Sequence, residues 1–236
     1  MSAPDLSDFD LVLLDMNGTF MFGHDRFGQG EDYYATYKSL GGSASGTSTV
    51  HHVIHRLCEE MSEKYRDIVW QDQFPSVRDT LLQLPPTIRP SYSEIDYIVE
   101  VIAAHELGDV PNNYSEAVRK LAQVQKIGVV SNLWSNKSRW IDRLKQRGLL
   151  ELFEVLVFSS DGPHIKPSIV LFERALRMLH IDPARALFVG DDRYRDIAGA
   201  AAAGMKTVLV GNANADCGMA DWQAPDFIEF VKRCAL

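Results

Sequence analysis

The chain has 236 residues, of which 46% are hydrophobic and 24% are charged, a composition typical of a globular protein with a complete hydrophobic core. Lys and Arg number 24 against 32 Asp and Glu, so the formal net charge is -8, and this acidic balance argues against a nucleic-acid-binding surface. No apolar run approaches the roughly 18 residues that a membrane-spanning helix needs, so we expect no membrane insertion through such a helix.

The N-terminal segment and the cysteines bear on the cellular compartment. Residues 1–10 contain three aspartates and no basic region ahead of an apolar run, unlike a secretory signal peptide. The three cysteines, Cys58, Cys217 and Cys234, are far apart and lack the CxxC spacing of redox and metal motifs. An odd, sparse set of this kind is typical of a reducing environment, and we expect a cytoplasmic protein.

The first strong signal along the chain is the segment around Asp15. Four apolar residues, Leu11–Leu14, lead directly into Asp15, and Gly18 follows after two more residues. A short apolar run that ends at a turn signal predicts a strand buried on both faces, as in parallel sheets. Asp15 then lies at the carboxyl end of a central strand, where open α/β sheets bind their ligands.

Residues 24–108 differ in character, with little strand signal and several helical patterns. Within residues 49–66, apolar side chains recur at the three- and four-residue spacing of one helix face. Ser91 and Glu94 have the spacing of a capping box. Helices are expected over residues 31–40, 49–66, a short segment that starts at Ser76 and ends before the prolines at 85 and 86, and 95–107.

From Pro111 onward, strand and helix patterns alternate, which predicts βαβ units and a parallel sheet. The expected strands cover residues 127–130, 155–158, 186–189 and 207–210, and the expected helices cover 115–125, 135–147, 168–180 and 194–203. The predicted fold class is therefore α/β, with a Rossmann-like parallel sheet core that has helices on both faces. Residues 1–23 and 109–236 form this core, and residues 24–108 form a small α-helical domain.

Polar residues follow the predicted strands at their carboxyl ends. Because parallel strands end at the same edge of a sheet, we expect these side chains to meet there. An acidic cluster with one lysine is the combination that a hard divalent cation and a phosphoryl group need together. The residues concerned are Asp15 after the first strand, Ser131 and Asn132 after the second, Lys166 before the helix at 168–180, and Asp191, Asp192 and Asp196 after the fourth.

These segments resemble the motifs of the haloacid dehalogenase-like hydrolase superfamily, in its phosphatase type with a helical cap after the first strand. Members carry DxDGT, a strand-end Ser or Thr, a Lys often followed by Pro, and GDxxxxD. The chain has Asp15–Thr19 (DMNGT), Ser131, Lys166 with Pro167, and Gly190–Asp196 (GDDRYRD) in the same order. The helical segment after the first strand matches the family's cap in position and character.

The resemblance implies a phosphatase mechanism with a covalent intermediate. Asp15 attacks phosphorus and becomes an aspartyl-phosphate. Ser131 and Asn132 bind the phosphoryl oxygens of the substrate, and Lys166 neutralises charge beside the nucleophile. The substrate that this mechanism implies is a small phosphorylated metabolite.

The resemblance also implies Mg²⁺ as the cofactor. Its ligands are expected to be Asp15, the backbone carbonyl of Asn17, and Asp191, which together offer the oxygen atoms that Mg²⁺ prefers. Mg²⁺ usually keeps several water molecules, and Asp192 or Asp196 is expected to orient them.

Asn17 departs from the family pattern, which has a second aspartate at this position. In family phosphatases that aspartate protonates the leaving group and later deprotonates the attacking water. A carboxamide has no proton that titrates near neutral pH, so Asn17 is not expected to do either, although its backbone carbonyl can still bind a metal.

A Mg²⁺-dependent phosphatase is the favoured interpretation, and two alternatives stay open. One is a dehalogenase or phosphonate hydrolase of the same superfamily, and the other is a catalytically weak protein that binds phosphate or a partner. The dehalogenases work without metal and lack the paired acids of the fourth motif, so Asp191 and Asp196 favour the phosphatase. Cap residues are expected to select the leaving group, with His24, Arg26, Tyr33, Tyr34 and Trp70 as candidates.

Overall fold

The computed structural model describes residues 3–211 and 219–234, so Cys217 lies outside the described part of the chain. A six-stranded sheet in the order β3-β2-β1-β4-β5-β6 forms its centre, and every neighbouring pair of strands is parallel. The strands are β1 (Leu11–Leu14), β2 (Ile127–Ser131), β3 (Phe153–Phe158), β4 (Ala186–Gly190), β5 (Lys206–Val210) and β6 (Trp222–Ala224).

Strand β1 lies between β2 and β4, and all four of its residues are inaccessible to solvent. Successive side chains of a strand point to opposite faces of the sheet. Val12 and Leu14 accordingly pack into one hydrophobic layer, whereas Leu11 and Leu13 pack into another. This confirms the prediction of a strand buried on both faces.

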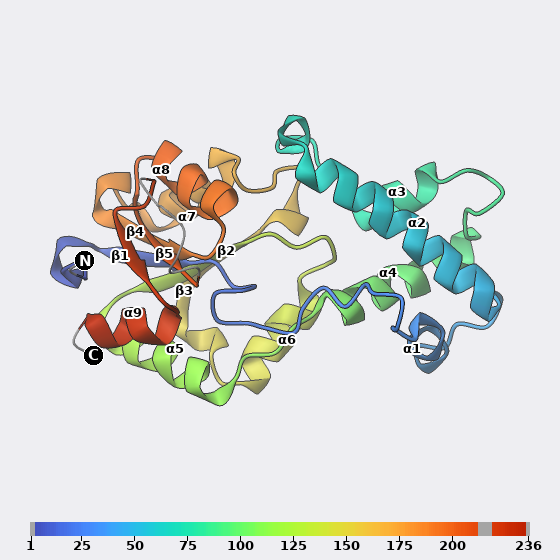
Figure 1. Ribbon diagram of the computed structural model, residues 1–236, viewed down its shortest axis with the longest axis horizontal. Helices are drawn as coiled ribbons and strands as arrows, with labels where there is room; N and C mark the ends of the chain where they lie inside the picture. Colours follow the sequence, from blue (N-terminus) through green and yellow to red (C-terminus); the bar gives the residue numbers. More distant parts are fainter. Residues whose placement is uncertain (1–2, 212–218, 235–236) are drawn as a thin grey trace.

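Helices cover both of these layers (Figure 1). On the side of Val12 and Leu14 the layer includes residues of α5 (Asn112–Val124), α6 (Ser138–Gln146) and α9 (Phe227–Arg233). On the side of Leu11 and Leu13 it includes residues of α7 (Ile169–Leu179) and α8 (Gly199–Ala202). The predicted Rossmann-like sheet with helices on both faces is therefore confirmed.

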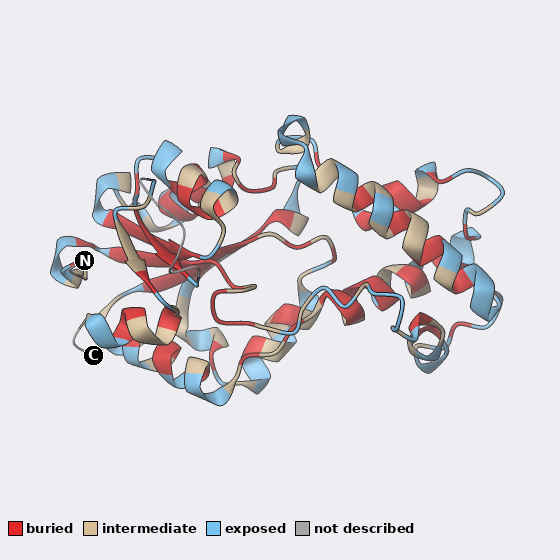
Figure 2. Ribbon diagram, in the orientation of Figure 1, coloured by how far each residue is buried: buried red, intermediate tan, exposed pale blue. Residues whose placement is uncertain are grey.

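Four further helices form a separate unit beside the sheet, at the right of Figure 1. They are α1 (Tyr33–Ser39), α2 (Thr47–Arg66), α3 (Val77–Gln83) and α4 (Tyr92–Glu106). Their apolar faces meet in a hydrophobic cluster distinct from the two layers of the sheet, and Figure 2 shows the buried residues along these helices. We refer to this unit as the cap.

The chain leaves and re-enters the sheet region through two adjacent segments. Phe22 and Asp109 form an antiparallel bridge there, with N–H to carbonyl distances of 2.9 Å in one direction and 2.8 Å in the other. The bridge lies at the predicted boundaries between residues 1–23, 24–108 and 109–236. It supports our proposal that residues 24–108 are a separate cap domain.

The expected strands and helices between residues 11 and 210 occur in the structure with the predicted type. The helix expected at 194–203 is a π-helix, Arg193–Ala198, that continues into α8. Two elements near the C-terminus, β6 and α9, were not expected. Within the described ranges, no helix combines the length and the apolar character needed to cross a membrane.

The two predicted helix caps have different outcomes. Ser76 does cap α3, because its hydroxyl oxygen accepts a hydrogen bond from the backbone N–H of Asp79 at 3.1 Å. The predicted capping box of α4 is wrong. Ser91 lies at the N-cap position, but its hydroxyl pairs with that of Ser93, and Glu94 instead accepts a hydrogen bond from a buried tyrosine hydroxyl of α1.

The packing of β2 between its neighbours yields a stability prediction at Gly128. A β-carbon on Gly128 would lie 2.5 Å from Cγ1 of Val155 and 2.8 Å from Cδ2 of Leu13. Overpacking of this kind costs about 1–3 kcal/mol, so we expect Gly128→Ala to lower the free energy of unfolding by that amount in urea denaturation. Gly162→Ala is the control because, apart from its neighbours in the chain, no heavy atom of the described residues lies within 4 Å of its β-carbon position. Equal stability of the two variants would contradict the prediction.

Candidate active site

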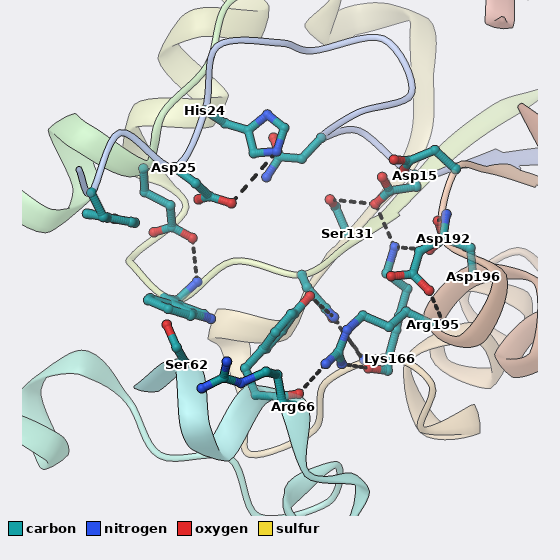
Figure 3. A pocket seen from close by; sticks show the side chains of 17 residues that line it. Asp15, His24, Asp25, Ser62, Arg66, Ser131, Lys166, Asp192, Arg195 and Asp196 are labelled. Carbon is teal, nitrogen blue, oxygen red and sulfur yellow. Dashed lines mark hydrogen bonds and ion pairs between the residues drawn. The ribbon is translucent and has the colours of Figure 1, made fainter. Parts of the chain in front are cut away.

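The carboxyl ends of β1, β2 and β4 open into a pocket of about 650 Å³. Asp15 directly follows β1, Ser131 is the last residue of β2, and Asp191 directly follows β4. All three line the pocket, together with Asn17 and Lys166 (Figure 3). Residues that lie far apart in the sequence thus meet at one edge of the sheet.

Asp15 is anchored through one of its two carboxylate oxygens. Its Oδ1 accepts hydrogen bonds from Ser131 Oγ at 2.9 Å and from Lys166 Nζ at 2.5 Å. Among the described residues, its Oδ2 has only a long contact with Thr19 Oγ1, at 3.5 Å, and the same hydroxyl lies 3.5 Å from Oδ1 of Asp191. A carboxylate held at one oxygen and open at the other is suited to nucleophilic attack.

Lys166 lies between two carboxylates in the interior of the molecule. Its Nζ is 2.5 Å from Oδ1 of Asp15 and 2.5 Å from Oδ1 of Asp196, and all three side chains are buried. Burial alone would lower the pKa of the ammonium group, but the two carboxylates more than offset this and raise it. The lysine is therefore a fixed positive charge beside Asp15.

Asn132 contacts the segment that carries this lysine. Its Oδ1 accepts a hydrogen bond from the backbone N–H of Lys166 at 2.8 Å. Its Nδ2 donates to the hydroxyl of Tyr65 at 3.1 Å and to the backbone carbonyl of Lys166 at 3.4 Å. The amide therefore positions Lys166 and contacts the cap, while its binding of substrate phosphate stays a prediction.

Asp191 lies against the backbone of the DMNGT segment. A β-carbon on Gly18 would be 2.3 Å from Oδ2 of Asp191, and the φ angle of Gly18 is +86°. Glycine is therefore needed here both for the close approach and for the backbone conformation. Burial, together with the negative charges of Asp15 and Asp196, raises the pKa of Asp191 to about 7.

The three carboxylates form a donor set that fits a divalent cation. Asp15, Asp191 and Asp196 each offer an oxygen, and these atoms all lie within 4.8 Å of one another. The mutual repulsion of the three charges would be relieved by a cation, and oxygen is the ligand atom that Mg²⁺ prefers. In the same pocket, Oδ1 of Asn17 is buried and has no hydrogen-bond partner in the part of the chain that the structure describes.

Asp192 and Asp196 hold the turn that follows β4. Oδ2 of Asp196 accepts a hydrogen bond from the backbone N–H of Asp192 at 3.0 Å. The carboxylate of Asp192 caps the π-helix Arg193–Ala198, where it accepts two backbone N–H groups at 2.8 and 2.9 Å. A π-helical turn of this kind is often found at a functional site. That either acid orients metal-bound water stays a prediction.

The cap side of the pocket was the least predictable part of the site. Of the five cap candidates, His24 lines the pocket and the other four do not. Arg26 instead donates to backbone carbonyls near the joint with the sheet, and Tyr33 is fully buried within the cap. The lining residues that the sequence did not identify are Asp25, Phe27, Ser62, Tyr65, Arg66, Glu106, Trp134 and Arg195.

Arg195 joins the cap to the turn after β4. Its guanidinium lies 3.4 Å from the ring centroid of Tyr65, at the end of α2, and donates to the backbone carbonyl of the same residue. A second nitrogen donates to the backbone carbonyl of Lys166 at 2.7 Å. One side chain thus connects the cap, the lysine segment and the acidic turn.

Glu106, the last residue of α4, makes a second connection between the cap and the sheet region. Its two oxygens accept hydrogen bonds from the backbone N–H groups of Trp134 at 2.6 Å and Ser135 at 2.9 Å. Burial raises the pKa of Glu106 to about 7, although these two hydrogen bonds favour the charged form. The cap is therefore linked to the loop after β2 by a carboxyl group that titrates near neutral pH.

The comparison with known families agrees with this architecture. The sequence model of the haloacid dehalogenase-like hydrolases matches residues 49–210, which is more than half of the chain. The chain belongs to this family. The resemblance noted in the motifs is thereby confirmed, and so is the predicted enzyme class, a hydrolase. The matched range contains Ser131, Lys166 and Asp191, and the segment with Asp15 precedes it.

Two curated phosphatases are similar to this haloacid dehalogenase-like hydrolase. Glyceraldehyde 3-phosphate phosphatase of Methanothermobacter thermautotrophicus is 34% identical over 102 residues, which cover 43% of this chain and 44% of that protein. The chain thus spans less than half of this relative's length. Pyrophosphatase PpaX of Bacillus cereus is 27% identical over 169 residues, which cover 67% of this chain and 77% of that protein.

A solved structure shows the same fold. The 2-haloacid dehalogenase of Pseudomonas syringae pv. tomato matches this haloacid dehalogenase-like hydrolase with a TM-score of 0.67 over 96% of this chain and 98% of that chain. The two sequences are 20% identical, so the likeness concerns the fold alone. It agrees with the parallel sheet and the helices described above.

The raised pKa of Glu106 predicts a pH dependence of stability. Because its pKa is about 7 in the folded protein against an ordinary value of 4.5, the folded protein retains a proton that the unfolded chain loses between these values. The contribution of Glu106 to the free energy of unfolding is therefore fully present at low pH and declines as the pH rises toward 7. We expect Glu106→Gln to reduce the difference in unfolding free energy between pH 5 and pH 7, by on the order of 2 kcal/mol.

Urea denaturation of both proteins at the two pH values, with a chelator present, measures this difference. Glu63→Gln, which replaces an exposed carboxyl group on α2, is the control and should behave like the parent protein. If Glu106→Gln leaves the difference between pH 5 and pH 7 unchanged, the assignment of the titration to Glu106 is wrong.

Proposed function

We propose that this haloacid dehalogenase-like hydrolase is a Mg²⁺-dependent phosphatase that acts on a small phosphate monoester. The observation that carries the proposal is the arrangement of Asp15. Ser131 and Lys166 hold its Oδ1, and its Oδ2 is left open on the side of Asp191. The two phosphatase relatives support the same class of reaction.

In the proposed mechanism, two displacements at phosphorus replace one. Oδ2 of Asp15 attacks phosphorus, the bond from phosphorus to the leaving oxygen breaks, and an aspartyl-phosphate forms. Water then attacks this phosphorus, inorganic phosphate leaves, and the carboxylate of Asp15 is restored. Lys166 and Ser131 offset the negative charge that gathers around the transferred phosphoryl group.

The residues that would hold Mg²⁺ are Asp15, Asn17 through its backbone carbonyl, and Asp191. When bound, the ion neutralises charge on the phosphoryl oxygens and on the surrounding carboxylates. Without a divalent cation, the three carboxylates within 4.8 Å of one another have, among the described residues, only Lys166 to balance them, and their remaining negative charge would repel a phosphate dianion. We therefore expect phosphatase activity to need a divalent cation.

A dehalogenase is the main rival function, since the fold is also that of a 2-haloacid dehalogenase. The acid cluster favours the phosphatase. A haloacid is itself an anion, and a metal-free reaction gives no reason to place Asp191 and Asp196 beside the nucleophile. The third interpretation, a protein that binds without turnover, is disfavoured by the intact anchoring of Asp15.

The first experiment tests the nucleophile. We expect Asp15→Asn to abolish turnover of an aryl phosphate in the presence of Mg²⁺, because an amide oxygen is a poor nucleophile toward phosphorus. Rapid quench with a substrate labelled at phosphorus should trap a phospho-enzyme in the parent protein and none in the variant. Circular dichroism establishes that the variant is folded.

The same assay separates the rival functions. Chloride release from 2-chloropropionate without metal would select the dehalogenase, and the absence of both reactions would select the binding protein. Comparable turnover of the aryl phosphate by Asp15→Asn and the parent protein would refute the assignment of the nucleophile.

Asn17 determines which phosphate esters are hydrolysed well. A positioned general acid is worth roughly 10²–10⁴ in rate, and Asn17 does not supply one. An aryl or acyl phosphate expels a stable anion and needs little protonation. An alkyl phosphate expels a strongly basic alkoxide and needs a proton donor, so the parent protein should show a steep dependence of rate on leaving-group pKa.

The second experiment uses Asn17→Asp. We expect this variant to raise turnover of alkyl phosphates far more than turnover of aryl phosphates, by a factor within the roughly 10²–10⁴ range of general acid catalysis. It should also speed the breakdown of the aspartyl-phosphate, because the attacking water regains a base. Single-turnover rates across a series of phosphates measure both effects.

Equal effects on alkyl and aryl phosphates would mean that another group supplies the proton. His24 would then be the first residue to replace, because it lines the same pocket and its Nδ1 is buried without a partner among residues 3–211 and 219–234.

A further inference from the structure

The pocket reaches beyond the nucleophile to helix α2 of the cap. Ser62 and Arg66 line it there, and as residues four apart on one helix they project from the same face. Figure 3 shows both side chains on the cap side of the pocket, away from Asp15. A substrate whose phosphoryl group contacts Asp15 would direct its leaving group toward this region.

Of the described residues that line the pocket, three carry a permanent positive charge. Lys166 is bound by two carboxylates. Arg195 donates to two backbone carbonyls and lies over the ring of Tyr65. Arg66 differs from both, because its guanidinium forms no hydrogen bond or ion pair with another described residue, and the residue is exposed.

Two acidic residues, Asp67 and Asp25, have partners other than Arg66. Asp67, its neighbour in sequence, accepts a hydrogen bond from the backbone N–H of Val69 at 3.1 Å and so caps its own short turn. Asp25 lies beside His24 in a different part of the pocket (Figure 3). No carboxylate of the described residues forms an ion pair with Arg66, so its guanidinium is available to a ligand.

We propose that Arg66 and Ser62 form a subsite for a second anionic group on the substrate. The proposal rests on the phosphatase function proposed above and specifies its substrate class: phosphate monoesters whose leaving group carries a carboxylate or a second phosphate. A guanidinium presents its donors in a planar fork that matches both kinds of anion. The hydroxyl of Ser62, one turn earlier on α2, adds a further donor on the same face.

Aryl phosphates that differ in the charge of one para substituent test this subsite. 4-Carboxyphenyl phosphate and 4-carbamoylphenyl phosphate have nearly the same shape and differ in the charge of the para substituent. 4-Phosphonophenyl phosphate places a phosphorus oxyanion at the same position, and so distinguishes a site for carboxylate from one for phosphate. The two leaving groups differ in pKa, so the contribution of the second anion is read from the change in the kcat/KM ratio of the charged to the neutral ester between the parent protein and Arg66→Gln.

We expect the kcat/KM ratio of the charged to the neutral ester to be roughly tenfold higher in the parent protein than in Arg66→Gln, the size of one charge-assisted contact. The loss in Arg66→Gln should arise mainly through KM, and Arg66→Lys should retain part of the preference. Arg56→Gln is the matched control, since it removes the same charge from the same helix at a position outside the pocket. It should keep the parent ratio.

Calorimetry on Asp15→Asn provides a second measurement that does not depend on turnover. The Kd values of the charged and neutral esters should differ by a similar factor in this variant, and the difference should disappear when Arg66→Gln is added. An unchanged kcat/KM ratio in Arg66→Gln, or equal Kd values of the charged and the neutral ester in Asp15→Asn, would overturn the subsite. Failure to hydrolyse any ester, with the binding preference intact, would instead overturn the phosphatase function.

Discussion

The site depends on one buried cation, the ammonium group of Lys166, which lies 2.5 Å from each of two carboxylates. Without it, Asp15 and Asp196 would place two negative charges where little water can reach them, and one would take up a proton. A protonated Asp15 would be a poor nucleophile. The surroundings of the lysine serve the same end, because Asn132 and Arg195 both bind its backbone and fix where the charge lies.

The arrangement around Asp15 follows from features that a single sequence reveals. A strand buried on both faces is recognised as an apolar run that ends at a polar side chain, and Asp15, Ser131 and Asp191 each mark such an end. Because the strands are parallel, their carboxyl ends lie at one edge of the sheet, and this can be predicted without knowing how the helices pack. The close approach of Asp191 to the DMNGT segment is likewise reflected in the sequence, as Gly18.

The cap side of the site could not be predicted in the same way. Helical periodicity shows that α2 has a buried face, but the orientation of Tyr65 and Arg66 depends on how the whole helix rests against the sheet region. Glu94 illustrates the same limit, because its carboxylate accepts a hydrogen bond from a buried tyrosine hydroxyl of α1 instead of forming the local capping box. Strand β6 has three residues, too few to show a pattern of alternation.

The contact between Arg195 and Tyr65 has a consequence for how this protein and its relatives can diverge. Arg195 belongs to the turn after β4, and Tyr65 belongs to helix α2 of the cap. Their contact therefore joins two parts of the chain that lie far apart in sequence. An inserted unit taken from another family member that lacks an aromatic side chain here would leave a guanidinium without its stacking partner beside the lysine segment. We therefore expect a cap without an aromatic residue at this position to fit better when residue 195 is exchanged along with it.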